Sequence, residues 1–481
     1  MADLRLQQPF TKIIAKNGNS IRFITFNVNG IKTVFNYHPW NKINNDFNTM
    51  FDLLEADIIT LQELKLTEQS LTTLKNIGHL QSYKSFISLP TRKKGYSGVG
   101  LFVRIPQTPL QKRYLTVTKA EEGLTGWLCD KTGNPYRSQD DNIGGYTDIN
   151  EQQGLHIDSE GRCVVVELAS NCVVFALYCP ANSLGTDEGE EFRLQFLQQL
   201  MKRCHNLKFN EGKDVIIMGD INVCLDLIDS AEGINERIMA KQITDVSDGN
   251  QFEVANYDEC CKFKQSKRAR ELMNEYVIRS MIQECTSQTL TNQFLYDTTR
   301  YIQGRRRKMY TVWNTLTNSR QVNYGSRIDL ILCSSPEMVK QVSNADIWPF
   351  ILGSDHCPVF TDFDIPWRQD SSSLIADSVV DNCYKLQFEA KTHFKLNKMR
   401  DISTLFGNAK KRSIQQSDTE TSSSVEPTPL SSSKLATPDS SQLKNDLYPH
   451  STTSKRPKLV YTSRKIVKKD AKPKAINDYF S

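Results

Sequence analysis

Short β-rich apolar runs alternate with helical or loop segments from about residue 20 to about residue 367. Runs of this length, bounded by turn-forming residues, predict buried strands. The pattern predicts strands at residues 21–28, 57–61, 98–103, 163–168, 172–178, 215–219 and 327–333. Within residues 191–200, Phe192, Phe196 and Leu200 recur at intervals of four. This spacing predicts an amphipathic helix that covers a sheet.

Two stretches inside this region lack such periodicity, and both are predicted to be surface insertions. The first covers residues 119–161, and the second covers 228–270, where a basic cluster leads into a helix. From about residue 369 onward Ser, Thr, Lys and Pro dominate, which predicts a disordered tail. We therefore expect an N-terminal extension at 1–19, a catalytic domain at 20–368 and the tail at 369–481.

Charge is distributed unevenly along the 481 residues. The whole chain has a formal net charge of only +5, yet residues 455–474 contain nine Lys or Arg and one Asp. That segment alone carries +8, which leaves −3 for the rest of the chain. The body is therefore not a cationic clamp for nucleic acid, and phosphate binding there requires a local patch or a metal ion.

The twelve cysteines show no paired spacing, and several of them lie inside apolar runs. We interpret them as reduced thiols that are mostly buried, as in an intracellular protein. No stretch approaches the roughly 18 apolar residues that a membrane span needs. We therefore expect a soluble protein without a membrane partner.

Polar side chains follow several of the predicted strands. They are Asn27 and Asn29 after the first run, Glu63 after the second, Asp220 and Asn222 after the run at 215–219, and Asp355 and His356 in a turn between Gly353 and Pro358. In layered α/β folds the ends of strands are where polar groups gather around a ligand. These side chains are therefore the candidates for one site.

These polar side chains are of the kinds that hydrolysis of a phosphodiester requires. A hard divalent cation held by carboxylates, with a carboxylate that takes the proton from water, supplies most of the chemistry. The candidate carboxylates are Glu63, Asp220, Asp329 and Asp355, and the candidate hydrogen-bonding groups are Asn27, Asn29, Asn222, Tyr178 and His356. Taken singly, each of these residues also has an explanation as a turn or cap residue. Spacing along the chain does not show whether they converge.

Seven short motifs, taken in order, resemble those of the endonuclease/exonuclease/phosphatase superfamily. They are Phe26-Asn27-Val28-Asn29-Gly30, Leu61-Gln62-Glu63-Leu64-Lys65, Tyr96-Ser97-Gly98-Val99-Gly100, Tyr178-Cys179-Pro180, Gly219-Asp220-Ile221-Asn222, Arg327-Ile328-Asp329-Leu330 and Gly353-Ser354-Asp355-His356. Within the superfamily the chain is similar to the apurinic/apyrimidinic (AP) endonucleases of the exonuclease III type. Segments 311–315 and 323–327 add to this similarity.

The resemblance implies an α/β fold, a four-layer sandwich of two packed mixed β-sheets flanked by helices. It implies that Mg²⁺ is the cofactor, with Mn²⁺ able to substitute, and that Glu63 is the principal ligand. The implied metal set also includes Asn29, Asp220, Asn222, Asp355 and His356. The implied catalytic set is Tyr178, Asp220, Asn222, Asp329 and His356, and the implied phosphate or DNA contacts are Asn27, Arg327 and Trp313.

The chain departs from the better-known AP endonucleases in two places. Ala181 follows the Pro of the Tyr-x-Pro motif where those enzymes have Asn, and Asn182 comes one position later. By motif alignment, Val312 and Ser326 occupy positions that carry pocket aromatics in those enzymes. We therefore expect Asn182 not to act as the family's Asn does, and we expect a less aromatic wall for a flipped abasic sugar.

These implications predict a DNA repair nuclease of base excision repair. It would cut 5′ to abasic sites in double-stranded DNA and process 3′ ends, as a 3′-5′ exonuclease and a 3′-phosphodiesterase. Two alternatives stay open at this point. One is a superfamily phosphatase or phosphodiesterase with a non-DNA substrate, because fold alone does not set function. The other is a catalytically inactive scaffold recruited to DNA by its tail.

The end of the tail resembles a motif that binds the sliding clamp, proliferating cell nuclear antigen. Ile476, Tyr479 and Phe480 have the spacing that places three apolar side chains on one helical turn. A second match with the same spacing begins at Ile402, and the alternative is a few apolar residues in a disordered tail. The basic segment that begins at Lys455 resembles a nuclear import signal, so we expect the protein in the nucleus.

Overall fold

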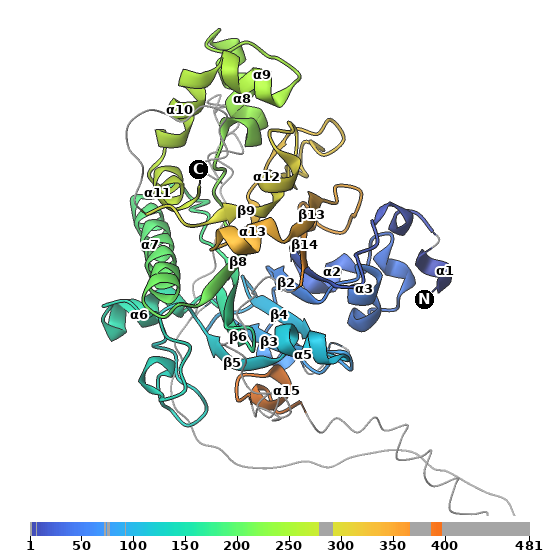
Figure 1. Cartoon of the computed structure of the whole chain (residues 1–481), viewed down its shortest axis with the longest axis vertical. Helices are drawn as coiled ribbons and strands as arrows, with labels where there is room; N and C mark the ends of the chain where they lie inside the picture. The colour runs from blue at the N-terminus through green and yellow to red at the C-terminus, as the bar shows by residue number, and fades with distance from the viewer. Residues whose placement is uncertain are drawn as a thin grey trace, which may run out of the picture. The chain divides into compact units, whose positions relative to one another are not determined.

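Two six-stranded mixed sheets form the centre of the molecule (Figure 1). The computed structural model describes residues 2–278, 292–365 and 386–396, apart from residues 6, 72–73, 75–76 and 92. The first sheet has the order β13-β14-β1-β2-β4-β3, with β1 at Ser20–Asn27, β2 at Ile58–Gln62, β3 at Tyr83–Ser88, β4 at Val99–Arg104, β13 at Val342–Ile347 and β14 at Val359–Asp364. The second has the order β5-β6-β7-β8-β12-β9, with β5 at Val117–Glu122, β6 at Cys163–Leu168, β7 at Cys172–Tyr178, β8 at Asp214–Asp220, β9 at Tyr296–Asp297 and β12 at Asp329–Cys333.

The remaining strands, β10 (Val312–Trp313) and β11 (Gly325–Ser326), form a separate ribbon. The α-helices are α1 (Ala2–Arg5), α2 (Ile31–Val34), α3 (Phe47–Leu53), α4 (Glu68–Leu71), α5 (Pro109–Leu115), α6 (Glu151–Asp158), α7 (Asp187–Phe209), α8 (Ala231–Met239), α9 (Gly249–Ala255), α10 (Tyr257–Gln265), α11 (Arg268–Tyr276), α12 (Thr298–Gln303), α13 (Pro336–Lys340) and α15 (Ala390–His393). All seven predicted strands are present, and the predicted helix at 191–200 lies inside α7.

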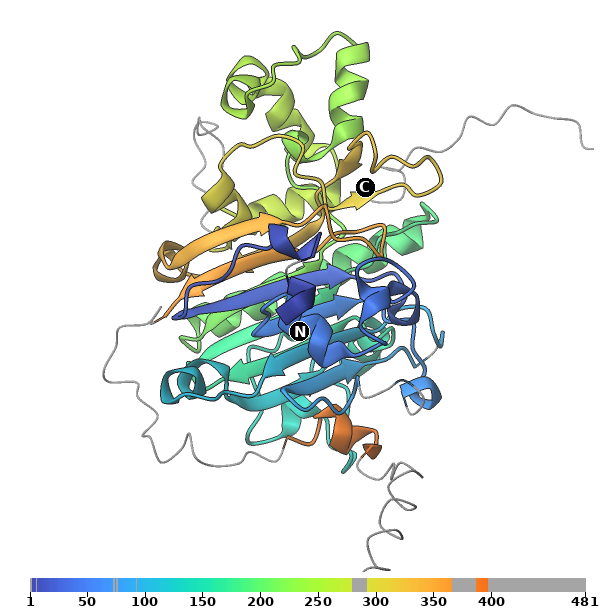
Figure 2. The same cartoon turned by 90° about the vertical axis from the view of Figure 1, so that its right-hand side faces the viewer.

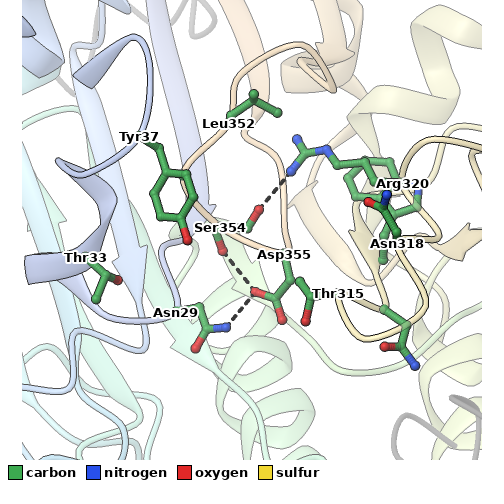
Figure 3. Close-up of a pocket in the computed structure, with 12 residues that line it drawn as sticks. Asn29, Thr33, Tyr37, Thr315, Asn318, Arg320, Leu352, Ser354 and Asp355 are labelled. Carbon is green, nitrogen blue, oxygen red and sulfur yellow. Dashed lines mark hydrogen bonds between the residues drawn. The ribbon is translucent and has the colours of Figure 1, made fainter. Parts of the chain in front are cut away.

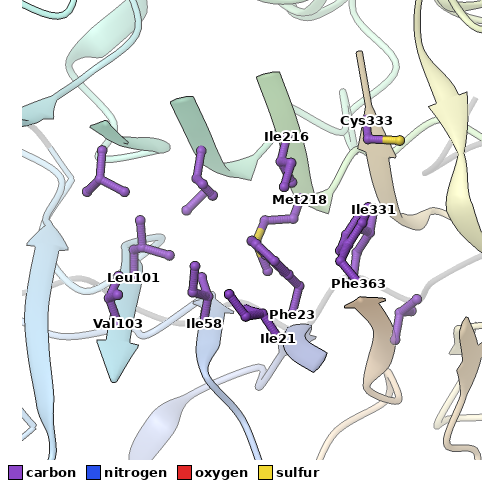
Figure 4. Close-up of a cluster of buried hydrophobic side chains, with 14 of the residues drawn as sticks. Ile21, Phe23, Ile58, Leu101, Val103, Ile216, Met218, Ile331, Cys333 and Phe363 are labelled. Atoms are coloured by element: carbon purple, nitrogen blue, oxygen red, sulfur yellow. The ribbon is translucent and has the colours of Figure 1, made fainter. Parts of the chain in front are cut away.

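The main hydrophobic core lies between the two sheets (Figure 4). Apolar side chains of the first sheet, such as Phe23 and Ile58, face those of the second, such as Met218 and Ile331, and all are fully buried. Two further clusters cover the outer faces, one with α3 on the first sheet and one with α7 on the second. These layers confirm the predicted four-layer sandwich and explain why the strands read as continuous apolar runs.

The structure differs from the two predicted insertions. Residues 231–276, most of them inside the second insertion, fold into α8, α9, α10 and α11, which lie at the opposite end of the fold from α15 (Figures 1 and 2). The first insertion contains most of β5 and all of α6. It is fixed by buried polar contacts, because the Asp158 carboxylate accepts from the Thr125 amide and hydroxyl, and Arg203 pairs with Glu121. Buried ion pairs and small apolar clusters together hold these regions, such as the cluster of Ile234, Phe252 and Phe263 in the second one.

The thiols agree with the expectation of reduced cysteines at most described positions. Nine cysteines are free, and all of them except Cys129 are buried. Cys261 is disulfide-bonded, so the expectation is wrong there. In the part of the chain that the structure describes, no helix is long and apolar enough to cross a bilayer.

Residues 386–396 belong with the folded domain, although the sequence pattern assigned them to the tail. Phe388 is 1% exposed, and its ring centroid lies 6.4 Å from those of Phe86 on β3 and Tyr136. Glu389 forms a β-bridge with Phe86, and α15 follows it. A single apolar segment inside a polar tail gave no periodic signal. The rest of the predicted division of the chain stays a prediction.

We expect Phe388→Ala to lower the free energy of unfolding of the full-length protein by about 3–5 kcal/mol, because it removes a buried aromatic ring. Leu184→Ala is the control, since Leu184 is 82% exposed and its loss should change the free energy by less than about 0.5 kcal/mol. Urea denaturation of both variants measures the difference. Equal stability of the two variants would show that segment 386–396 does not contribute to the fold.

Candidate active site

The pairing of strands brings the predicted acidic residues to one edge of the sandwich. Asp220 ends β8, and Asp329 begins the antiparallel neighbour β12, so the two are direct partners in the ladder. Tyr178 ends β7, which runs parallel to β8, and it pairs with Asp220 on the other side. Three side chains that are far apart in sequence therefore lie on adjacent strands at one level of the sheet.

Three residues just beyond β1, β2 and β8 have left-handed backbone conformations. The φ angles are 45° at Asn29, 51° at Glu63 and 56° at Asn222. Asn tolerates this region, but for Glu it costs about 1–2 kcal/mol. The turns reverse the chain at the strand ends, so that the side chains lie over the edge of the sheets. Backbone strain of this kind clusters at functional sites.

Asn27 connects the two sheets across this edge. Its Nδ2 donates to Glu63 Oε1 at 3.0 Å and to Asp220 Oδ2 at 2.9 Å, and the residue is fully buried. Glu63 follows β2 of the first sheet, and Asp220 ends β8 of the second. Both amide hydrogens bind carboxylates here, so Asn27 positions Glu63 and Asp220. The expected role of Asn27 as a phosphate or DNA contact stays a prediction.

A second series of contacts extends from Glu63 in the other direction. Lys65 Nζ lies 3.0 Å from Glu63 Oε2 and also donates to the side-chain oxygen of Asn29. Asn29 Nδ2 donates to Asp355 Oδ1 at 2.9 Å, and the Ser354 hydroxyl donates to the same oxygen at 3.1 Å (Figure 3). Sequence reasoning missed Lys65, although it ends the quoted Leu-Gln-Glu-Leu-Lys motif. The Lys65 ammonium lies between oxygens of Glu63 and Asn29, which indicates that the electrostatic potential there is strongly negative.

His356 completes the row of polar groups. Its Nδ1 lies 2.8 Å from Asp329 Oδ2, and its Nε2 lies 3.9 Å from Asp220 Oδ2. Burial opposes protonation of the imidazole, but Asp329 and then Asp220 outweigh it and raise the pKa of His356 to about 10. Burial, followed by the charge of Asp329, raises the pKa of Asp220 to about 8. Asp220 is thus a stronger base than an ordinary carboxylate, and His356 is a fixed proton donor.

Asn222 and Tyr178 are held by groups that sequence reasoning did not identify. Asn222 Nδ2 donates to the Cys179 carbonyl at 2.8 Å, and the Asn222 carbonyl accepts from the buried Arg193 guanidinium at 2.6 Å. The Arg162 guanidinium lies 4.6 Å from the Tyr178 ring centroid. Burial, and next the charge of Glu63, raises the pKa of Tyr178 well above its usual value, so the phenol stays a hydrogen-bond donor. Arg162, just before β6, and Arg193, on α7, gave no signal in the sequence because each is an isolated arginine.

The donor set suits a hard divalent cation. Glu63, Asp220, Asn29, Asn222 and Asp355 all offer oxygen, the ligand atom that Mg²⁺ prefers. Within the described part of the chain, Asn222 Oδ1 is buried without a hydrogen-bond partner, as is one oxygen of Asp329. One set of potential ligand atoms, from Asp220, Asp329 and His356, lies within 4.8 Å. We favour the oxygen-rich residues because a hard divalent cation prefers oxygen to imidazole nitrogen.

Arg327 does not lie at this site, and its expected role as a phosphate contact is wrong. Its guanidinium is 1% exposed, makes two 2.9 Å hydrogen bonds to Asp229 and lies 2.7 Å from Asp297. A guanidinium committed to two buried carboxylates cannot bind solvent-facing phosphate. Arg327 instead joins the loop before α8 to the start of β12, next to Asp329.

Trp313 lines a groove beside the site, although it is only 3% exposed. Its indole N–H donates to Asn323 at 3.0 Å, so Trp313 offers no free polar group to DNA. Val312 and Ser326 are partners in the β10–β11 ribbon, and no aromatic ring takes their place there. Asn182 accepts from the Thr186 amide at 3.2 Å at the start of α7. The expectation that it does not act as the family's Asn stays a prediction.

The predicted clamp-binding residues Ile476, Tyr479 and Phe480 lie outside the described residues, as do Ile402 and the basic segment. Their roles stay predictions.

Comparison with known proteins agrees with this geometry. Residues 24–356 match the model of the Endonuclease/Exonuclease/phosphatase family. The match covers most of the chain, and the chain belongs to this family. The resemblance deduced from the seven motifs is therefore confirmed.

The relatives define a narrower group within the family. DNA-(apurinic or apyrimidinic site) endonuclease 2 of Saccharomyces cerevisiae is 46% identical over 369 residues, which are 74% of this chain and 69% of the yeast protein. The protein of the same name from Schizosaccharomyces pombe is 31% identical, over 71% of this chain and 58% of its own length. The chain belongs with the AP endonuclease 2 proteins.

A solved structure supports the fold. The crystal structure of the Xenopus laevis APE2 catalytic domain has a TM-score of 0.53 and 26% identity, and the match covers 72% of this chain and 92% of that one. The expected sandwich architecture is thus found in a relative.

Arg327→Ala should destabilise the protein by about 3–5 kcal/mol, because it leaves the buried Asp229 carboxylate without its bidentate partner. The matched control is Arg306→Ala, which removes a surface pair with Asp346 and should cost at most about 1 kcal/mol. Chemical denaturation of both variants measures the costs. A folded, fully stable Arg327 variant that binds DNA weakly would restore the phosphate-contact hypothesis.

Proposed function

We propose that this chain is a Mg²⁺-dependent DNA repair nuclease that hydrolyses phosphodiesters 5′ to abasic sites and processes 3′ ends in base excision repair. The 3′ processing would include 3′-5′ exonuclease and 3′-phosphodiesterase action. The observation that carries the proposal is the continuous row from Asp355 through Asn29, Lys65, Glu63 and Asn27 to Asp220. The names of the relatives point to the same substrate.

The roles follow from the positions of the groups. Glu63, with Asn29 and Asp355, would hold the cation, which when bound neutralises charge on the phosphate and on the leaving oxygen. Asp220 accepts the proton of the attacking water, because its raised pKa makes it basic enough for the task. Asn222 orients that water or the phosphate beside Asp220.

The other groups stabilise charge in the transition state. His356, held by Asp329, donates from Nε2 toward a phosphate oxygen. Tyr178 donates its phenolic proton to the scissile phosphate or the leaving oxygen. Asn27 reacts with nothing and keeps Glu63 and Asp220 at a fixed separation.

The preferred substrate is a 3′ end rather than an internal abasic site. Val312 and Ser326 leave the site without the aromatic pair that would clasp a flipped sugar. A frayed 3′ end costs less to unstack than an internal nucleotide, so it depends less on such a pocket.

Two labelled duplexes test this function in Mg²⁺, one with an internal abasic site and one with a recessed 3′ end. We expect the wild type to process the 3′ end faster, and we expect Glu63→Gln and Asp220→Asn to lose on the order of 10²- to 10⁴-fold in rate while staying folded. The exposed Asp140→Asn is the matched control. An inactive wild type would support a scaffold, and near-normal activity in either acid variant would refute that residue's role.

We further propose that the tail brings the enzyme to the nuclear sliding clamp through Ile476, Tyr479 and Phe480. These apolar side chains would share one helical turn in a groove of the clamp. The basic segment before them would support nuclear import and add electrostatic attraction to DNA.

Tyr479→Ala combined with Phe480→Ala should abolish most clamp binding by the full-length protein, measured by calorimetry. Exonuclease activity without clamp should not change, because these residues lie outside the catalytic machinery. If the double variant bound clamp normally, the contact would move to the segment at Ile402, and Leu405→Ala with Phe406→Ala would then test that segment.

A further inference from the structure

A groove with a volume of about 490 Å³ adjoins the active site and is not used by the proposed chemistry. It shares Asn29 and Asp355 with the site. Figure 3 shows Thr33 and Tyr37, from α2 and the turn after it, on one wall, and Thr315 and Asn318, from the β10–β11 loop, on the other. A ligand in the groove would therefore lie next to a phosphate bound at the site.

The groove is poorly suited to a phosphate. Arg320 is the one cation among the residues that line it, and its guanidinium lies 4.5 Å from the Trp313 ring centroid. Its terminal nitrogens donate to backbone carbonyls, at 2.8 Å to Ser354 and at 2.7 Å to Ile351. The one acid, Asp355, is occupied by Asn29 and Ser354. A nucleic acid backbone needs available cations, and this lining offers none.

The groove offers what a nucleobase needs. The residue Tyr37 is 53% exposed and Leu352 is 45% exposed, so an aromatic and an aliphatic surface face the opening. Bases stack on aromatic rings, and amide or hydroxyl groups such as those of Asn318 and Thr315 bond to base edges. A volume of 490 Å³ lies within the usual range for small-ligand sites.

We propose that this groove binds the base of the nucleotide adjacent to the scissile phosphate, with Tyr37 as its stacking platform. The proposal rests on the proposed nuclease function and deepens it. A base inside a duplex is already stacked and paired, so only an unpaired base can enter the groove. The groove would therefore select 3′-terminal nucleotides that are free to leave the helix, including mismatched ones.

A fluorescent base tests the proposal without catalysis. Partial duplexes carry 2-aminopurine at either nucleotide that flanks the 3′-terminal phosphodiester, and full-length protein is added in EDTA. We expect quenching at one of the two positions with the wild type and with Tyr37→Phe, which keeps the ring. Tyr37→Ala should lose the quenching and bind roughly 5- to 150-fold more weakly, as loss of one stacked base implies.

Two controls separate the possible failures. Tyr301→Ala removes a ring that is 51% exposed on α12, outside the groove, and should behave as the wild type. A partner duplex with an abasic spacer at the quenched position should bind the wild type and Tyr37→Ala equally. Quenching at neither position, or equal quenching in Tyr37→Ala, would overturn the groove proposal. Cleavage of the same duplexes after Mg²⁺ is added tests the nuclease function separately.

Discussion

The site depends on a single amide. The Nδ2 group of Asn27 donates one hydrogen to Glu63, beyond the first sheet, and one to Asp220, at the end of the second. Two carboxylates this close repel one another unless a donor or a cation lies between them. The Asn27 amide meets that need without adding charge, so negative potential is left for a divalent cation. Because Asn27 is fully buried, the packing of both sheets fixes its position.

The packing of the two sheets thus also fixes the positions of the side chains in the site. The core between the sheets sets the distance at which β1 faces β8, and the polar row begins where that core ends. Arg327 extends the arrangement away from the site, because its pairs with Asp229 and Asp297 attach the region around α8 to the start of β12. The buried Arg327 thus holds these segments in place, and groups other than Arg327 contact the substrate.

The strands and most of the site were predictable because each strand is a continuous apolar run that ends in a polar residue. The order of the motifs then implied that residues such as Asp329 and His356 lie together in one site, which their spacing along the chain could not show. Arg327 was misassigned, and the contact of Asn27 with Asp220 was not predicted. A sequence shows which side chains can bind phosphate, but not which are already bound by partners 98 or 193 positions away. Lys65 and segment 386–396 were missed for a related reason, since only the fold gives them their neighbours.

The proposed base-binding groove and the ribbon together would let one active site favour ends over internal lesions. An enzyme that clasps a flipped sugar gains from a rigid aromatic wall at the sugar, whereas Val312 and Ser326 provide no ring there. The aromatic surface instead lies at Tyr37, across the groove from Thr315 and Asn318, where a neighbouring base rather than the sugar would reach it. Stacking would then be gained only by a nucleotide that has a base and can leave the helix. The enzyme would thus select substrates by how readily the 3′-terminal nucleotide leaves the helix. The same carboxylates would cleave both 3′ ends and internal abasic sites.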